Sequence, residues 1–115
     1  MKTHDMFERG DIVSVNFPFT DISITKKRPA LIISDEKVNN TGDYLLVQIT
    51  SKVKHDGLSL ELNRTDYHKN ELPLKSYVRL HKIFLLNESL IIRKESSVKK
   101  TFLLLLTEKI SELIK

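Results

Sequence analysis

The stretch GDIVSVNFP at residues 10–18 is the part of this 115-residue chain that decides its fold class. A glycine and an aspartate open it with a turn signal. Val13, Val15 and Phe17 then occupy every second position, which is the spacing of a β-strand with one buried face. Pro18 ends the pattern because proline has no backbone N–H to offer a neighbouring strand. We therefore predict a strand between the turn and the proline.

Short apolar segments continue beyond this strand and are separated by polar turns. Residues 29–34 form a nearly continuous apolar run, which favours a strand covered on both faces. At residues 76–83 the alternation puts Tyr77, Arg79 and His81 on one face of a strand. Further strands are predicted at residues 44–50 and 57–62, and a short edge strand at 90–92. Between the strands we predict a loop at 20–27, a turn cluster at 38–43 and a polar segment with a short helical turn at 65–71.

The C-terminal residues change to a helical period. Leu103, Leu106 and Ile110 are three and four positions apart, which predicts an amphipathic helix, and Thr101 or a neighbour is a candidate for its N-cap. Several short strands followed by one helix predict a mainly β fold, a small β-barrel closed by a C-terminal α-helix. The length fits a single domain over residues 1–115.

The composition excludes several classes of protein. Because the chain has no cysteine, disulfides, thiolate nucleophiles and cysteine zinc sites are excluded. The net charge of +4 is a mild bias towards a polyanionic partner such as nucleic acid. No apolar run approaches the length of a membrane span, and the polar N-terminus lacks the apolar stretch of a signal peptide. We therefore expect a cytoplasmic protein.

Common catalytic motifs are missing, which leaves polar residues at the predicted strand ends. The sequence has no P-loop, dinucleotide fingerprint, HExxH or GxSxG motif, and its four histidines are scattered, so we expect no metal and no cofactor. Arg28, before a buried strand, can offer its guanidinium to a phosphate or is an exposed loop cation. Thr50 and Ser51 can bond a phosphate oxygen or only cap their strand. Two interpretations are open for Arg79 and His81: they belong to a functional site, or they are ordinary surface residues of a sheet.

In order and spacing, four segments together resemble the sequence pattern of the MazF/PemK toxins. That pattern reads "GD-hydrophobic" and an aspartate- or proline-containing loop, then "RP-small-hydrophobic-V/I-S", then "P-hydrophobic-T-S/T", then "PSYVRLDKI". The matching segments are Gly10–Val13 with Asn16–Phe19, Lys27–Ser34, Gln48–Ser51 and Leu74–Ile83, and they extend over most of the chain.

The resemblance implies a fold, an activity and partners. The family fold is an SH3-like β-barrel with a C-terminal helix, normally a homodimer. Its members cut single-stranded RNA at short sequences without a metal, which leaves a 2′,3′-cyclic phosphate and a 5′-hydroxyl and inhibits translation. They are toxins of two-gene systems, each neutralised by its cognate antitoxin. Here we expect the antitoxin to be an acidic, partly disordered peptide in a basic groove.

The resemblance also implies site residues. Arg28 and Thr50 fall on the two positions most closely tied to cleavage, and Arg79 and His81 fall where a PemK branch has further active-site residues. His81 stands where the family often has aspartate, so it acts as an acid or base or marks a lost carboxylate role. Expected RNA-binding residues are Phe19, Thr20, Lys26, Lys27, Ser51, Lys52 and Tyr77.

Two other functions fit the same barrel. A gyrase-poisoning toxin of the CcdB type needs no Arg28–Thr50 pair, but it typically acts through C-terminal residues, which here form an ordinary amphipathic helix. A non-catalytic SH3-like RNA-binding module would show basic and aromatic residues without needing those two side chains together. Endonuclease activity is therefore the main prediction.

Overall fold

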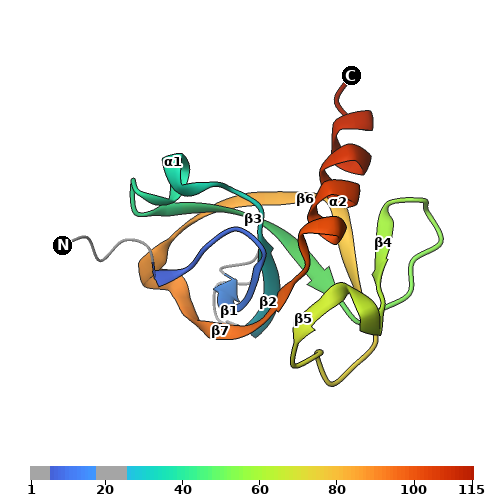
Figure 1. Cartoon of the computed structure of the whole chain (residues 1–115), viewed down its shortest axis with the longest axis horizontal. Helices are drawn as coiled ribbons and strands as arrows, with labels where there is room; N and C mark the ends of the chain where they lie inside the picture. Colours follow the sequence, from blue (N-terminus) through green and yellow to red (C-terminus); the bar gives the residue numbers. More distant parts are fainter. Residues whose placement is uncertain (1–5, 18–25) are drawn as a thin grey trace.

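Seven antiparallel strands form one curled sheet with a helix at the C-terminal end (Figure 1). The computed structural model describes residues 6–17 and 26–115. Within this part the strand order is β4-β6-β3-β2-β1-β7-β5, and the outer strands β4 and β5 are not paired with each other. The elements are β1 (Asp11–Phe17), β2 (Lys26–Ile32), α1 (Glu36–Asn39), β3 (Asp43–Thr50), β4 (Ser59–Leu62), β5 (Tyr67–Lys69), β6 (Ser76–Asn87), β7 (Ile91–Val98) and α2 (Lys100–Glu112), with single 3-10 turns at Arg64–Asp66 and Glu88–Leu90. The predicted mainly β fold with a C-terminal helix is confirmed, as a half-closed barrel.

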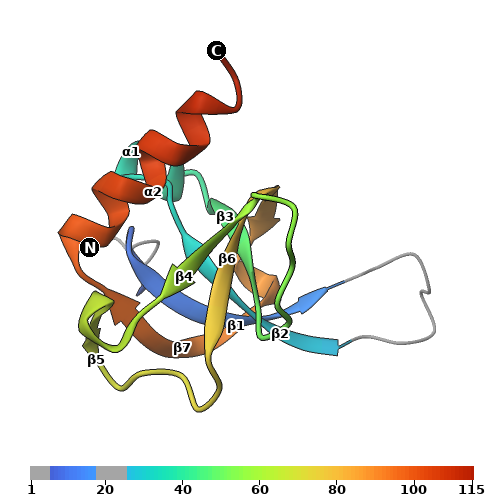
Figure 2. The same ribbon diagram turned by 90° about the vertical axis from the view of Figure 1, so that its right-hand side faces the viewer.

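The apolar run in β2 is buried on both faces of the sheet, as its sequence predicts. Ala30, Leu31 and Ile32 are fully buried. Leu31 belongs to a core that includes Phe102 of α2, whereas Ala30 and Ile32 belong to a second core around Tyr44. The central strand therefore separates two cores, and Figure 2 shows α2 on one side of the curled sheet, away from the far ends of β1 and β2.

The turn before β1 joins the sheet to the helix. The backbone N–H of Gly10 donates to the Ile32 carbonyl at 2.8 Å. The φ angle of Gly10 is +98°, which residues other than glycine rarely adopt. A Cβ at this position would lie 3.1 Å from Cδ1 of Leu103, on α2. The Asp11 carboxylate accepts a hydrogen bond from the Glu8 backbone N–H at 3.0 Å. Glycine is needed here by both backbone conformation and space.

The structure corrects several predicted elements. The short edge strand predicted at 90–92 is wrong, because β7 runs over eight residues and pairs with both β1 and β5. The polar side chains of β7 hide its strand period. The turn cluster predicted at 38–43 overlaps the last two residues of α1, which is capped by the Asp35 side chain, and its turn lies at residues 40–42. The N-cap of helix α2 is Lys99, two residues before Thr101, and no side chain caps this helix end.

Candidate active site

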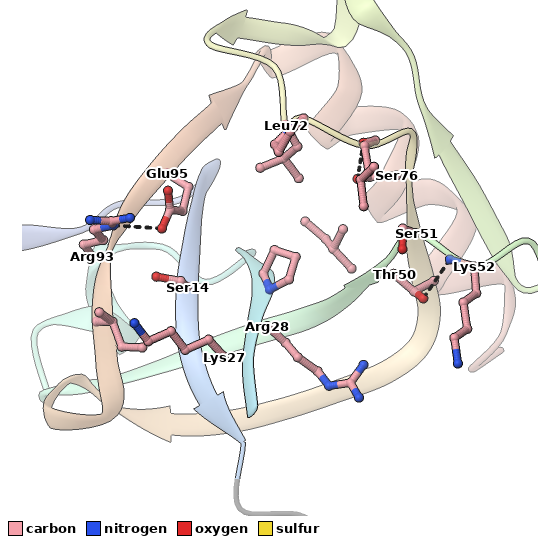
Figure 3. Close-up of a pocket in the computed structure, with 15 residues that line it drawn as sticks. Ser14, Lys27, Arg28, Thr50, Ser51, Lys52, Leu72, Ser76, Arg93 and Glu95 are labelled. Atoms are coloured by element: carbon pink, nitrogen blue, oxygen red, sulfur yellow. Dashed lines mark hydrogen bonds and ion pairs between the residues drawn. The ribbon is translucent and has the colours of Figure 1, made fainter. Parts of the chain in front are cut away.

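A pocket of about 610 Å³ opens where the start of β2 meets the end of β3. Its walls also include parts of β1 and β7 and the segment between β5 and β6 (Figure 3). Strand register explains why β2 and β3 contribute here. The two strands are antiparallel, so the first residues of one lie beside the last residues of the other.

Arg28 and Thr50 both line this pocket. The register pairs Ala30 with Gln48 and Leu31 with Val47. Extended by two residues towards the strand ends, the same register brings Arg28 opposite Thr50. Directly opposite residues on antiparallel strands project their side chains from the same face. Both side chains are half-buried.

The Thr50 hydroxyl is held in a defined position. Its Oγ1 accepts a hydrogen bond from the Lys52 backbone N–H at 3.1 Å. A hydroxyl group has one hydrogen to donate, and this contact uses only a lone pair. Thr50 is thus able to donate to an acceptor in the pocket. Ser51 and Lys52, which follow it, line the same end of the pocket and are exposed.

The opposite end of the pocket carries an ion pair between two residues of β7. Arg93 Nε lies 3.0 Å from Glu95 Oε2. The hydrogen bond from Arg93 holds the pKa of Glu95 below its usual range, and a hydrogen bond from the Ser14 hydroxyl and the charge of Lys27 lower it further. Figure 3 shows Ser14, Arg93 and Glu95 across the pocket from Arg28 and Thr50. Both ends of the pocket therefore carry cations and hydroxyl groups, and the second end also presents a carboxylate.

Arg79 lies in a different place. Its side chain is nearly buried and does not line the pocket. Its guanidinium donates from Nη1 to Asp56 Oδ1 at 3.0 Å and to Ser59 Oγ at 2.8 Å, and from Nη2 to Asp56 Oδ2 at 2.8 Å. These hydrogen bonds keep the pKa of the Asp56 carboxyl well below its usual range.

The comparisons with known proteins agree with the fold. The family model described as "PemK-like, MazF-like toxin of type II toxin-antitoxin system" matches residues 8–114. The chain belongs to this toxin family. No curated protein sequence matches the chain closely enough to count as a relative.

Solved structures of the family share the toxin fold. MazF (Form-I) from Deinococcus radiodurans superposes with a TM-score of 0.76 at 21% identity, covering 95% of this chain and 96% of that one. An endoribonuclease in complex with its cognate antitoxin from a mycobacterial species gives 0.75 at 17% identity, with 94% of each chain covered. A MazE–MazF complex (Form-III) from D. radiodurans gives 0.71 at 20% identity, with 95% and 96% covered. At these identities the likeness shows the fold.

The other predicted site residues of this toxin chain are spread more widely. Lys27, Ser51 and Lys52 line the pocket. His81 is exposed and Tyr77 is half-buried, and neither lines it. The predictions for Phe19, Thr20 and the Lys26 side chain lie outside the described residues.

Sequence analysis missed the β7 side of the pocket. Ser14, Arg93 and Glu95 were not singled out, although Arg93 and Glu95 are two positions apart and share a strand face. The missed signal was the Arg-x-Glu spacing itself, which is visible only once residues 91–98 are recognised as a strand. Among residues 6–17 and 26–115, no three His, Asp or Glu side chains gather as a metal site would require. None of the described helices is long and apolar enough to cross a membrane.

Proposed function

We propose that this toxin is a sequence-specific, metal-independent endoribonuclease that cuts single-stranded mRNA in the cytoplasm and so inhibits translation and growth. The observation that carries the proposal is the shared pocket of Arg28 and Thr50, on neighbouring strands in matching register. Family membership supports the same activity.

The reaction needs no nucleophile from the protein, because RNA supplies one. The 2′-oxygen attacks the adjacent phosphorus as its proton leaves, and the bond from phosphorus to the 5′-oxygen breaks. The leaving 5′-oxygen takes up a proton, so the products are a 2′,3′-cyclic phosphate and a 5′-hydroxyl. Catalysis then depends on holding the phosphate in line and on stabilising its growing negative charge.

Arg28 and Thr50 suit those two tasks. A guanidinium group offers several hydrogen-bond donors and no acceptor, so Arg28 stabilises charge rather than removing a proton. The Thr50 hydroxyl, oriented by Lys52, donates to a phosphate oxygen. Lys27 and Lys52 add positive charge along the pocket, where they attract the RNA backbone. A part in cleavage for Arg79 and His81 stays a prediction.

The proposed partners are an antitoxin and a second copy of the chain. Several of the structural relatives are toxin–antitoxin complexes. An acidic antitoxin segment would find the cationic residues of the pocket complementary. A homodimer would cover the apolar side chains of α2 that are exposed in a single chain, such as Leu104 and Leu105.

Incubation of the purified protein with a long single-stranded RNA in EDTA tests the activity. We expect discrete cuts with cyclic-phosphate ends, and Arg28→Ala should abolish them without lowering the melting temperature. Arg64→Ala is the matched control, because Arg64 is highly exposed and lies outside this pocket. Cutting that persists in Arg28→Ala contradicts the proposed site. Binding of RNA without any cutting would favour a non-catalytic RNA-binding barrel.

A further inference from the structure

The second end of the pocket has a chemistry that phosphate binding does not explain. Glu95 is the only acidic side chain among the described residues that line the pocket. A carboxylate repels a phosphodiester, so at this position it weakens RNA binding unless it contacts a part of the RNA that donates hydrogen bonds. Ribose 2′-hydroxyls donate hydrogen bonds in every nucleotide, whereas the N–H donors of nucleobases differ from one base to another.

The Glu95 carboxylate is fixed in place but not saturated. It accepts a hydrogen bond from Arg93 Nε. The register of β1 and β7 pairs Ser14 with Arg93, so Ser14 lies beside this ion pair on the neighbouring strand. A carboxylate has about four lone-pair sites, and the contact with Arg93 leaves room for further donors. The side chain is 30% exposed and is therefore reachable from the pocket.

The apolar part of the pocket lining suits the flat face of a base. The apolar residues that line the pocket are Pro29, Ile49, Leu72, Pro73, Leu74 and Ile92. A volume of about 610 Å³ exceeds what a phosphate group needs and falls within the usual range for pockets that hold small organic ligands. A nucleotide with its phosphate at Arg28 and Thr50 would extend its base towards Glu95.

We propose that Ser14, Lys27 and Glu95 form a base-binding subsite that selects guanine. The inference deepens the proposed ribonuclease function and rests on it. Guanine presents two adjacent donors, N1–H and N2–H, to the two carboxylate oxygens, and its neighbouring O6 accepts from a cation such as Lys27. Uracil presents a single N–H between two carbonyl oxygens, and a carboxylate repels both of them.

Cleavage of a mixed-sequence RNA, with sequencing of the cut ends, provides the first test. We expect guanine at one position of the wild-type motif, and Glu95→Gln should lower the preference for guanine over uracil there by about tenfold, because a carboxamide also donates to uracil carbonyls. Glu61→Gln is the matched control, since Glu61 pairs with Lys75 outside this pocket and the substitution removes the same charge. Its motif should equal the wild type.

The outcomes separate the two proposals. A wild-type protein that cuts RNA, with a motif unchanged in Glu95→Gln, overturns the subsite and leaves the ribonuclease proposal intact. The same result with altered inhibition by an antitoxin would assign Glu95 to protein binding, which also overturns the subsite. A wild-type protein that cuts no RNA contradicts the ribonuclease proposal, and a binding measurement then decides the subsite.

That measurement determines the affinity of the protein for guanosine 5′-monophosphate and for uridine 5′-monophosphate. Binding is monitored through the NMR chemical shifts of the protein. We expect the guanosine nucleotide to bind about tenfold more tightly than the uridine nucleotide, and Glu95→Gln to abolish the difference. Equal binding of the two nucleotides by the wild type overturns the subsite. Thermal unfolding of Glu95→Gln verifies that the variant is folded.

Discussion

Arg79 and Asp56 form an ion pair with two parallel hydrogen bonds, in which the guanidinium is nearly buried and the carboxylate is half-exposed. Asp56 belongs to the segment between β3 and β4, and Arg79 lies on β6. The pair therefore ties that connecting segment to the sheet. The same segment begins with Ser51 and Lys52, which line the pocket. Arg79 can thus affect the pocket without lining it.

Removal of the carboxylate should destabilise the fold. Asp56→Ala leaves the buried guanidinium of Arg79 with only the Ser59 hydroxyl among these partners, and an uncompensated buried cation is unfavourable. We expect the melting temperature to fall by several degrees. Glu61→Ala is the comparison, because it breaks the exposed pair with Lys75 and such pairs contribute little. Equal melting temperatures for the two variants would contradict a stabilising role for the Arg79–Asp56 pair.

Acid should weaken the fold through the same contact. The folded-state pKa of Asp56 lies well below its ordinary value of 3.8, chiefly because Arg79 donates to it. A depressed pKa contributes stability above the ordinary value, and this contribution is lost as the pH falls below about 4 towards the folded-state pKa. Melting temperatures measured between about pH 2 and 7 should therefore drop at acid pH in the wild type.

The matched variant for this pH dependence is Asp56→Asn. It carries no titrating group at that position, so its acid-induced drop in melting temperature should be smaller than in the wild type. The remaining drop would include the contribution of Glu95, whose pKa is also lowered. A variant with the same acid profile as the wild type would show that the pair contributes no pH dependence.

Loss of the Thr50 hydroxyl should impair cleavage more than folding. Thr50→Val keeps the shape of the side chain but removes the donor proposed to contact the phosphate. Loss of one such donor in other enzymes lowers kcat by about 100- to 1,000-fold, and we expect a decrease of that order. Thr50→Ser keeps the hydroxyl and should retain most of the activity. Rates on a single-stranded oligonucleotide measure the effect, and comparable rates for the valine and serine variants would exclude this role.

The accuracy of sequence-based prediction differed between the two sides of the pocket. Arg28 and Thr50 stand at the ends of strongly apolar strands, so the strand pattern placed them correctly at strand ends, and strand register then brings them together. Glu95 lies in a strand dominated by polar residues, where the alternation is hidden, and its position in the pocket depends on pairing between β1 and β7.

Arg79 illustrates a second reason why sequence has limited reach. The strand period predicts which face of β6 the side chain occupies, and that face carries Tyr77 and His81 as well. It does not predict that Asp56, 23 residues earlier, returns to meet the guanidinium. Such a contact depends on the path of an irregular segment, which no periodic pattern encodes.

Substitution of two glycines should separate backbone strain from crowding. Gly10 and Gly57 both have positive φ, +98° and +76°, so alanine is strained at either position, by about 1–2 kcal/mol. Only at Gly10 does the added Cβ also meet a neighbour, Leu103 of α2 at 3.1 Å, whereas nothing lies within 4 Å at Gly57. Gly10→Ala should therefore lower the free energy of unfolding more than Gly57→Ala, as measured by denaturant titration. In a Leu103→Ala background the two glycine variants should differ less in free energy of unfolding, because the atom that crowds the new Cβ is gone. If Gly10→Ala lowers the free energy of unfolding no more than Gly57→Ala does, crowding against α2 contributes nothing.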